Sequence, residues 1–211
     1  MEENVNPKKR GRPAAFDYDH ALQLAMRAFW QYGYEGTSMS TLMAAMQMNK
    51  ASIYAAYGSK EVLFQTAIEQ YVQGPASFVS IALEQPTIIA VIRHLLTGAA
   101  KMMTEDQHLA GCLVTKGALT GSVESKDMQA LLSDYRKVSE QRFRHRFEQA
   151  KVDHDLPETI DTMALAKLVM TIHQGMTVQA ISGVEQSELL AMAEMAVQMI
   201  EKSYVITQEG V

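Results

Sequence analysis

The sequence predicts an all-α fold in which a small N-terminal domain of three helices precedes a larger helical C-terminal domain. Apolar residues recur three or four positions apart, and the C-terminal part carries no β-strand pattern. Hydrophobic residues make up 47% of the 211 residues and charged residues 20%, as in ordinary folded chains. We divide the chain into an arm (1–15), a helix-turn-helix domain (16–60) and a second helical domain (61–211).

The first two helices of the N-terminal domain are expected to be joined by a short connection. Apolar positions at helical spacing begin after Asp17, and Gly33 is expected to end this helix in a left-handed conformation. Thr37 or Ser38 can cap a second helix that ends at Met46, because a hydroxyl at that position accepts a hydrogen bond from an amide of the first turn.

A third and a fourth helix are expected to follow closely. Asn49 can cap a helix that runs to about Tyr57, and Ser59 can cap the next one after a break at Gly58. The pair Gly74-Pro75 should end the fourth helix. The second and third helices match the helix-turn-helix plan, in which the later helix of the pair enters the major groove of DNA.

Longer helices dominate the C-terminal part. Pro86 suits the first turn of a helix with one apolar face, and glycines divide residues 105–123 into short helical pieces and turns. Three longer helices are expected over residues 126–151, 158–182 and 186–204.

The last two of these helices are apolar around nearly their whole circumference, so each needs packing partners on two sides. Two interpretations stay open: central helices of a core, or the interface of a homodimer in which two copies form a four-helix bundle. The candidate interface residues are Leu165, Val169, Met176, Met192, Met195 and Met199.

Charge is distributed unevenly along the chain. The net charge is −5, but residues 1–60 carry seven Lys and Arg against five Asp and Glu, a balance of +2, and the remainder carries −7. Such a chain approaches a polyanion with its basic end. Within the arm, Arg10 and Arg12 flank a glycine and can insert into a narrow minor groove, although a basic run is also consistent with a solvated tail.

The segment from Tyr32 to Leu63 carries the most specific pattern, which is YGYEGTSMSTLMAAMQMNKASIYAAYGSKEVL. Along nearly its whole length it resembles the DNA-binding signature of the tetracycline-repressor (TetR) family. The resemblance implies a homodimeric transcription regulator, usually a repressor, that binds operator DNA. It also implies that a small-molecule effector, bound in the C-terminal ligand-binding and dimerisation domain, releases the DNA.

Candidate DNA contacts follow from the helix positions and from this resemblance. A helix start with hydroxyls can hold a phosphate, and small residues let a helix approach the base edges. Tyr54 and Lys60 resemble the phosphate-contacting tyrosine and lysine of the family, while Tyr54 could also be a half-buried packing residue. The full set is Arg10, Arg12, Thr37, Ser38, Lys50, Ala51, Ser52, Tyr54, Ala55 and Lys60.

Three residues depart from the family pattern. Gln47 stands at the turn where the family usually has glycine, so a left-handed conformation there would be strained. Ala55 and Ala56 replace larger polar residues, which moves base recognition towards Lys50, Ser52 and the arm.

The effector is expected in a cavity among the middle helices, where methionines are frequent. Flexible thioethers suit a pocket for apolar ligands, as they suit any core. Cys112 is either a buried small hydrophobe or a thiol that senses electrophiles or oxidants, and His173 and Gln174 either orient a ligand or sit in a core. The candidate pocket residues are Met102, Met103, Cys112, His173 and Gln174. Arg142, Arg144 and His145 are expected on a basic, solvated face.

Several other classes are disfavoured. No glycine-rich phosphate loop, nucleophile elbow or HExxH spacing is present, so we expect neither an enzyme nor a metal site nor a cofactor. A single cysteine and the lack of long apolar runs predict a cytoplasmic protein without a membrane span. A helical protein-interaction module remains an alternative, but it does not explain the basic arm or the pattern from Thr37 to Lys60.

Overall fold

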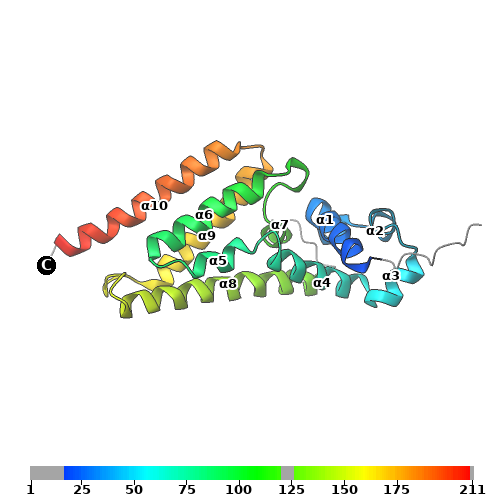
Figure 1. Cartoon of the computed structure of the whole chain (residues 1–211), viewed down its shortest axis with the longest axis horizontal. Helices are drawn as coiled ribbons and strands as arrows, with labels where there is room; N and C mark the ends of the chain where they lie inside the picture. Colours follow the sequence, from blue (N-terminus) through cyan, green and yellow to red (C-terminus); the bar gives the residue numbers. More distant parts are fainter. Residues whose placement is uncertain (1–16, 120–125, 210–211) are drawn as a thin grey trace, which may run out of the picture.

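The computed structural model describes residues 17–119 and 126–209, and the predicted arm with Arg10 and Arg12 lies outside them. The described residues form ten α-helices and one short 3-10 helix, with no β-strand (Figure 1). The helices are α1 (Tyr18–Gly36), α2 (Met39–Met46), α3 (Lys50–Tyr57), α4 (Lys60–Gln73), α5 (Phe78–Leu83), α6 (Ile88–Thr104), the 3-10 helix η1 (Gln107–Leu109), α7 (Leu113–Leu119), α8 (Lys126–Val152), α9 (Thr162–Ile181) and α10 (Gln186–Glu209).

The predicted caps of the N-terminal helices are confirmed. Ser38 accepts a hydrogen bond from the Thr41 amide at the start of α2, and Asn49 accepts one from the Ser52 amide at the start of α3. Ser59 accepts a hydrogen bond from the Val62 amide at the start of α4, and the predicted Gly74 caps the C-terminal end of this helix. Each cap satisfies an amide that has no partner within its own helix.

Two backbone positions define the connections between the first three helices. Gly33 has φ 72°, as expected of a glycine, but the helix resumes beyond this kink and ends at Gly36, so the predicted stop at Gly33 is wrong by three residues. Gln47 adopts the predicted left-handed conformation, with φ 54° and ψ 36°, and ends α2. Without that left-handed residue the chain could not turn tightly into α3.

Helices α8 and α10 begin at the predicted residues, whereas α6 and α9 differ from expectation in their starts. Pro86 was expected in the first turn of α6 but precedes the helix, because Thr87 is the cap and its hydroxyl accepts a hydrogen bond from the Ala90 amide. Asp161 caps α9, so this helix begins four residues later than predicted. The short helix α5 was not predicted, since its six residues are too few to show helical periodicity.

The helices form an elongated molecule with α1–α3 at one end and α10 reaching towards the other (Figure 1). Helix α6 packs against α5, α9 and α10, and α9 also packs against α8. Helix α1 packs against α2 and α4 and reaches α7 and η1. Among the described residues, no helix has both the length and the apolarity that crossing a membrane requires.

The predicted interface residues divide into two groups. Leu165, Val169 and Met176 of α9 are buried inside their own protomer, so their expected place at a dimer interface is wrong. Helix α9 packs against α6 and α8, so the burial of these residues agrees with the interpretation of α9 as a core helix. On α10, Met192 is half-buried, whereas Met195 and Met199 are 64% and 67% exposed.

Candidate nucleic-acid interface and internal cavity

Helix α3 presents one exposed side and one buried side. Ile53 is buried against the core of the N-terminal domain. Lys50, Ala51, Tyr54 and Ala55, all predicted contacts, are exposed. The predicted contact Ser52 is half-buried and borders a shallow hollow between α3 and the start of α1. The exposed side is therefore narrow and built mostly from small side chains, as close approach to a groove requires.

Thr37 does not fit its predicted role as a phosphate contact. The residue is 0% exposed, and its hydroxyl donates to the carbonyl oxygen of Gly33 at 2.6 Å and to that of Ala28 at 3.2 Å. Thr37 therefore fixes the kink of α1. A phosphate at this helix start would instead meet the exposed residues Ser38 and Ser40, whose hydroxyls are 2.7 Å apart. Sequence analysis did not propose Ser40 as a phosphate contact, because it lies in the first turn of α2 and only the capping residue, Ser38, has a recognisable sequence pattern.

Lys60 lies at the start of α4, within a small polar cluster. Its Nζ is 4.3 Å from the centroid of the Tyr34 ring, and the Tyr34 hydroxyl donates to Glu61 Oε1 at 2.6 Å. Partial burial lowers the pKa of Lys60, while the charges of Glu61 and Glu35 oppose that effect. The cation–π contact holds the ammonium group in place beside the helix-turn-helix.

The two tyrosines of α3 occupy different environments. Tyr54 is 39% exposed, and the Nζ of Lys50 lies 5.8 Å from its ring centroid. Tyr57 is half-buried against the core, and its hydroxyl donates to the Tyr18 carbonyl oxygen at 3.3 Å. Tyr54 is thus accessible to DNA that approaches α3, whereas Tyr57 links α3 to α1 through its hydrogen bond to Tyr18.

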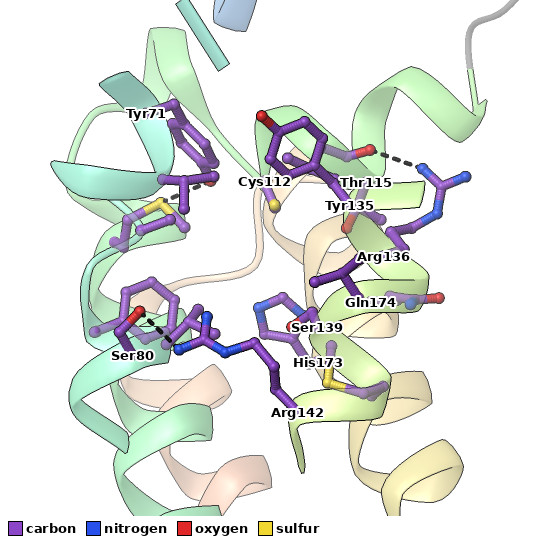
Figure 2. Close-up of a pocket in the computed structure, with 18 residues that line it drawn as sticks. Tyr71, Ser80, Cys112, Thr115, Tyr135, Arg136, Ser139, Arg142, His173 and Gln174 are labelled. Atoms are coloured by element: carbon purple, nitrogen blue, oxygen red, sulfur yellow. Dashed lines mark hydrogen bonds between the residues drawn. The ribbon is translucent and has the colours of Figure 1, made fainter. Parts of the chain in front are cut away.

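A cavity of about 180 Å³ lies between α4, α5, α6, α7, α8 and α9 (Figure 2). Four of the five predicted pocket residues line it: Met102, Cys112, His173 and Gln174. Met103 does not, because it is fully buried on another side of α6, where Thr177 contacts its sulfur at 3.8 Å.

The polar lining residues on α8 were not predicted. Tyr135, Arg136, Ser139 and Arg142 of α8 line the cavity. Figure 2 shows Tyr135 and Arg142 reaching into it, whereas the Arg136 guanidinium turns towards the Val114 carbonyl oxygen. Ser139 follows Tyr135 by four residues and Arg136 by three, and Arg142 follows Ser139 by three, so the residues share one side of the helix. That spacing was the available signal. Arg142 is exposed, as predicted, and it also borders the cavity, which was not predicted.

The cavity is electrostatically asymmetric. No Asp or Glu is among its described lining residues, which include Arg136 and Arg142. Burial lowers the pKa of Arg136, and its Nη1 donates to the Val114 carbonyl oxygen at 3.0 Å. His173 is buried, and burial lowers its pKa from 6.5 to about 4, so it is neutral at pH 7.

The cavity wall also contacts the N-terminal domain through Trp30 of α1. The Trp30 ring packs edge-to-face against the ring of Tyr71, a cavity residue of α4, with the two ring centroids 4.9 Å apart. Its Nε1 donates to the Gly111 carbonyl oxygen at 2.8 Å, and Lys116 Nζ donates to the Trp30 carbonyl oxygen at 2.9 Å. These contacts flank Cys112, so the segment that lines the cavity also holds α1.

The sequence model of the bacterial regulatory proteins of the tetR family matches residues 21–67, which span α1 to the middle of α4. The transcriptional repressor ComR of Escherichia coli (strain K12) is 30% identical over 188 residues, which cover 88% of this chain and 90% of ComR. The repressor BdcR of the same organism is 27% identical over 195 residues, covering 90% and 92% of the two chains.

Solved structures agree in fold and in sequence. A cysteine mutant of the TetR family transcriptional regulator CifR, complexed with 26-bp double-strand operator DNA, matches with a TM-score of 0.82 and 39% identity. The match covers 89% of this chain and 98% of the CifR chain. The chain therefore belongs to the tetR family of bacterial regulatory proteins and is a DNA-binding transcriptional regulator.

Proposed function

We propose that this protein is a homodimeric repressor that holds operator DNA and releases it when a small molecule occupies the cavity. The observation that carries the proposal is the contact between the cavity wall and α1. Tyr71 and the segment around Cys112 line the cavity and also hold Trp30. The proposal keeps residues 16–60 as the DNA-binding domain and residues 61–211 as the effector-binding and dimerisation domain.

The DNA-facing surface of the proposal is built from α2, α3 and the start of α4. Lys50, Ala51, Tyr54 and Ala55 form the side of α3 that enters the major groove, and Ser52 borders it. Ser38 and Lys60 hold phosphates on either side, which positions the helix without reading sequence. Arg10 and Arg12 are proposed for the adjacent minor groove.

Release requires that an occupied cavity disfavours the DNA-bound arrangement of the two recognition helices. Successive major grooves on one face of B-DNA are about 34 Å apart, so both helices must keep that separation. A ligand that displaces Tyr71 or the segment 111–116 would move Trp30 and with it α1, which packs on α2. Effector binding then shifts the population away from the DNA-binding geometry.

The proposed dimer contact lies on α9 and α10. Met195 and Met199 of α10 are largely exposed, and so are Met163, Leu168 and Val178 of α9. Exposed apolar residues on two long neighbouring helices suit a four-helix bundle between two copies. Light scattering after gel filtration tests this interpretation: the double variant Met195→Glu, Met199→Glu should be monomeric.

A matched control for the dimer test is Val152→Glu, which places the same charge at an exposed valine at the end of α8. It should remain dimeric. Dimeric behaviour of the methionine double variant would remove α10 from the proposed interface.

Binding to DNA immediately upstream of the protein's own gene, compared with scrambled DNA at fixed moderate salt, tests the repressor proposal. Fluorescence anisotropy should show tight, sequence-selective binding by a dimer. Equal affinity for the scrambled DNA would contradict an operator at that position.

A second candidate, a thiol-based sensor, is favoured by the surroundings of Cys112. This buried cysteine lines the cavity, and both Lys116 and Arg136 are close enough to interact with it electrostatically. If thiol sensing operates, N-ethylmaleimide should release DNA from the wild type and not from Cys112→Ser. Release from both proteins would exclude Cys112 as the sensor.

A further inference from the structure

We propose that the cavity takes a small amphipathic carboxylate, with its apolar body beside Tyr71, Met102 and Cys112 and its carboxylate towards Arg142, Ser80 and His173. This inference deepens the proposed function and depends on the cavity being the effector site. It names the chemical class of the ligand, which neither the fold nor the family relationship specifies.

The first argument is His173, a buried side chain whose two ring nitrogens both lack a hydrogen-bond partner among the described residues. Leaving a buried polar group unpaired costs roughly 1–3 kcal/mol. Figure 2 shows the His173 ring projecting from α9 into the space between α5 and α8. An acceptor such as a carboxylate oxygen would satisfy the N–H of the neutral ring.

The second argument is the sign of the charge around this space. Arg142 reaches across from α8 to α5, where its Nη2 lies 3.4 Å from Ser80 Oγ (Figure 2). Arg136 lines the same cavity, and the described lining contains no carboxylate to balance either arginine. A cationic ligand would be repelled, and a neutral one would leave the arginines without an anion. A carboxylate matches a guanidinium in both charge and geometry.

The third argument concerns shape and size. The part of the cavity towards α4 and α6 is lined by Tyr71, Val72 and Met102, with Cys112 beside them, and it offers few polar atoms. The volume of about 180 Å³ is slightly larger than the roughly 150 Å³ of a cavity that accepts benzene. One ring or a short alkyl chain therefore fits beside the carboxylate.

Calorimetric titration of the full-length dimer with matched ligand series tests the proposal. Each series keeps one apolar body and changes the head group: phenylacetate, phenylacetamide and 2-phenylethylamine, then hexanoate, hexanamide and hexylamine. At least one acid should bind at about 1 mM or tighter and exceed its amide and its amine by about tenfold or more. No binding by either acid, or equal binding by an amide or amine, would overturn the proposal.

Arg142→Gln should weaken binding of the acid by about tenfold or more and bring it close to that of the amide, because only the acid gains from the guanidinium. Arg144→Gln, an exposed arginine on the same helix that does not line the cavity, is the matched control and should bind the acid as the wild type does. Unchanged acid affinity in Arg142→Gln would overturn the proposed carboxylate position.

DNA release is measured separately, which keeps the two proposals distinguishable. An acid that binds with the expected preference but leaves operator binding unchanged would contradict ligand-controlled release and support the ligand class. If the amides or amines bound instead and released the DNA, the proposed ligand class would be wrong and the release mechanism would be supported.

Discussion

His173 has no hydrogen-bond partner among the described residues, and its burial has a consequence for stability. In the unfolded chain this side chain takes up a proton near its ordinary pKa of 6.5, whereas in the folded protein it does so only near pH 4. Between these values the unfolded state binds more protons, so the free energy of unfolding falls as pH falls.

We therefore predict that His173→Leu reduces the loss of stability on acidification. Urea unfolding at pH 7.5 and at pH 4.5 should show a difference between the two pH values that is smaller in the variant, by up to about 3 kcal/mol. Replacing His145, which is exposed on α8, by leucine serves as the control and should leave that difference as it is in the wild type. An identical pH dependence in His173→Leu and wild type would mean that His173 is not held neutral.

Lys60 leads to a prediction about salt rather than pH. Its ammonium group is held over the Tyr34 ring at the start of α4, in position to neutralise a phosphate. Lys60→Ala should weaken binding to all DNA sequences and reduce the slope of log affinity against log salt by about one for each protomer on the DNA. Lys202→Ala, at the far end of α10, should leave the slope unchanged. The same slope in Lys60→Ala and wild type would remove Lys60 from the phosphate contacts.

At the scale of elements, the connection from α2 to α3 depends on Gln47 in a left-handed conformation. A non-glycine residue in this conformation is strained by roughly 1 kcal/mol. Glycine would remove the strain, but its greater conformational freedom in the unfolded chain would offset part of the gain in stability. We predict that Gln47→Gly raises the free energy of unfolding by about 0.5 kcal/mol or more. Ala44→Gly, on the exposed side of α2, should lower it by about 1 kcal/mol. Both are measured by urea unfolding, and destabilisation by Gln47→Gly would contradict the strain.

Sequence reasoning predicted the elements that depend on local chemistry. Ser38, Asn49 and Ser59 cap helices because a short polar side chain can reach an amide two or three residues away, which is visible in the sequence. The start of α6 was missed because proline also suits a first turn, whereas here the Thr87 hydroxyl caps the helix and leaves Pro86 before it.

Tertiary contacts explain the other differences. An apolar helix does not indicate which of its faces meets its own core, so Val169 and Met176 were assigned to a dimer interface although they are buried within the protomer. Met102 and Met103 are neighbours on α6, and only the packing of α4 and α7 places the first in the cavity wall. The assignment of Arg142 to a solvated face was correct, because the residue is exposed. That it also borders a cavity was not predictable, because the cavity forms only when α5, α8 and α9 come together.

At the scale of the whole molecule, the cavity and the DNA-binding helices share Trp30. Its ring meets Tyr71 and its Nε1 donates to Gly111, so both walls of the cavity nearest α1 are tied to one side chain. A second link, the ion pair between Arg27 and Asp106 at 2.6 Å, joins α1 to the residues just before η1. Because this pair is largely exposed, it contributes little, and the buried contacts of Trp30 are the stronger candidates for coupling.

Coupling between two sites is reciprocal, which makes the mechanism testable without knowledge of the natural effector. If phenylacetate or hexanoate weakens operator binding by some factor, saturating operator must weaken binding of that acid by the same factor, commonly about 5- to 150-fold. Trp30→Phe keeps an aromatic ring beside Tyr71 but removes the donor to Gly111. We predict that it retains operator binding in the absence of acid while both factors decrease together.

Calorimetric titration of the acid, with and without saturating operator, measures one factor, and anisotropy of labelled operator at rising acid concentration measures the other. Tyr32→Phe, which changes an exposed aromatic residue of the same helix, is the control and should leave both factors as they are in the wild type. Acid affinity that does not respond to saturating operator would show that the cavity and the DNA surface are independent. If both factors in Trp30→Phe equalled those of the wild type, the hydrogen bond to Gly111 would not carry the coupling. The coupling would then lie in other contacts between α1 and the larger domain.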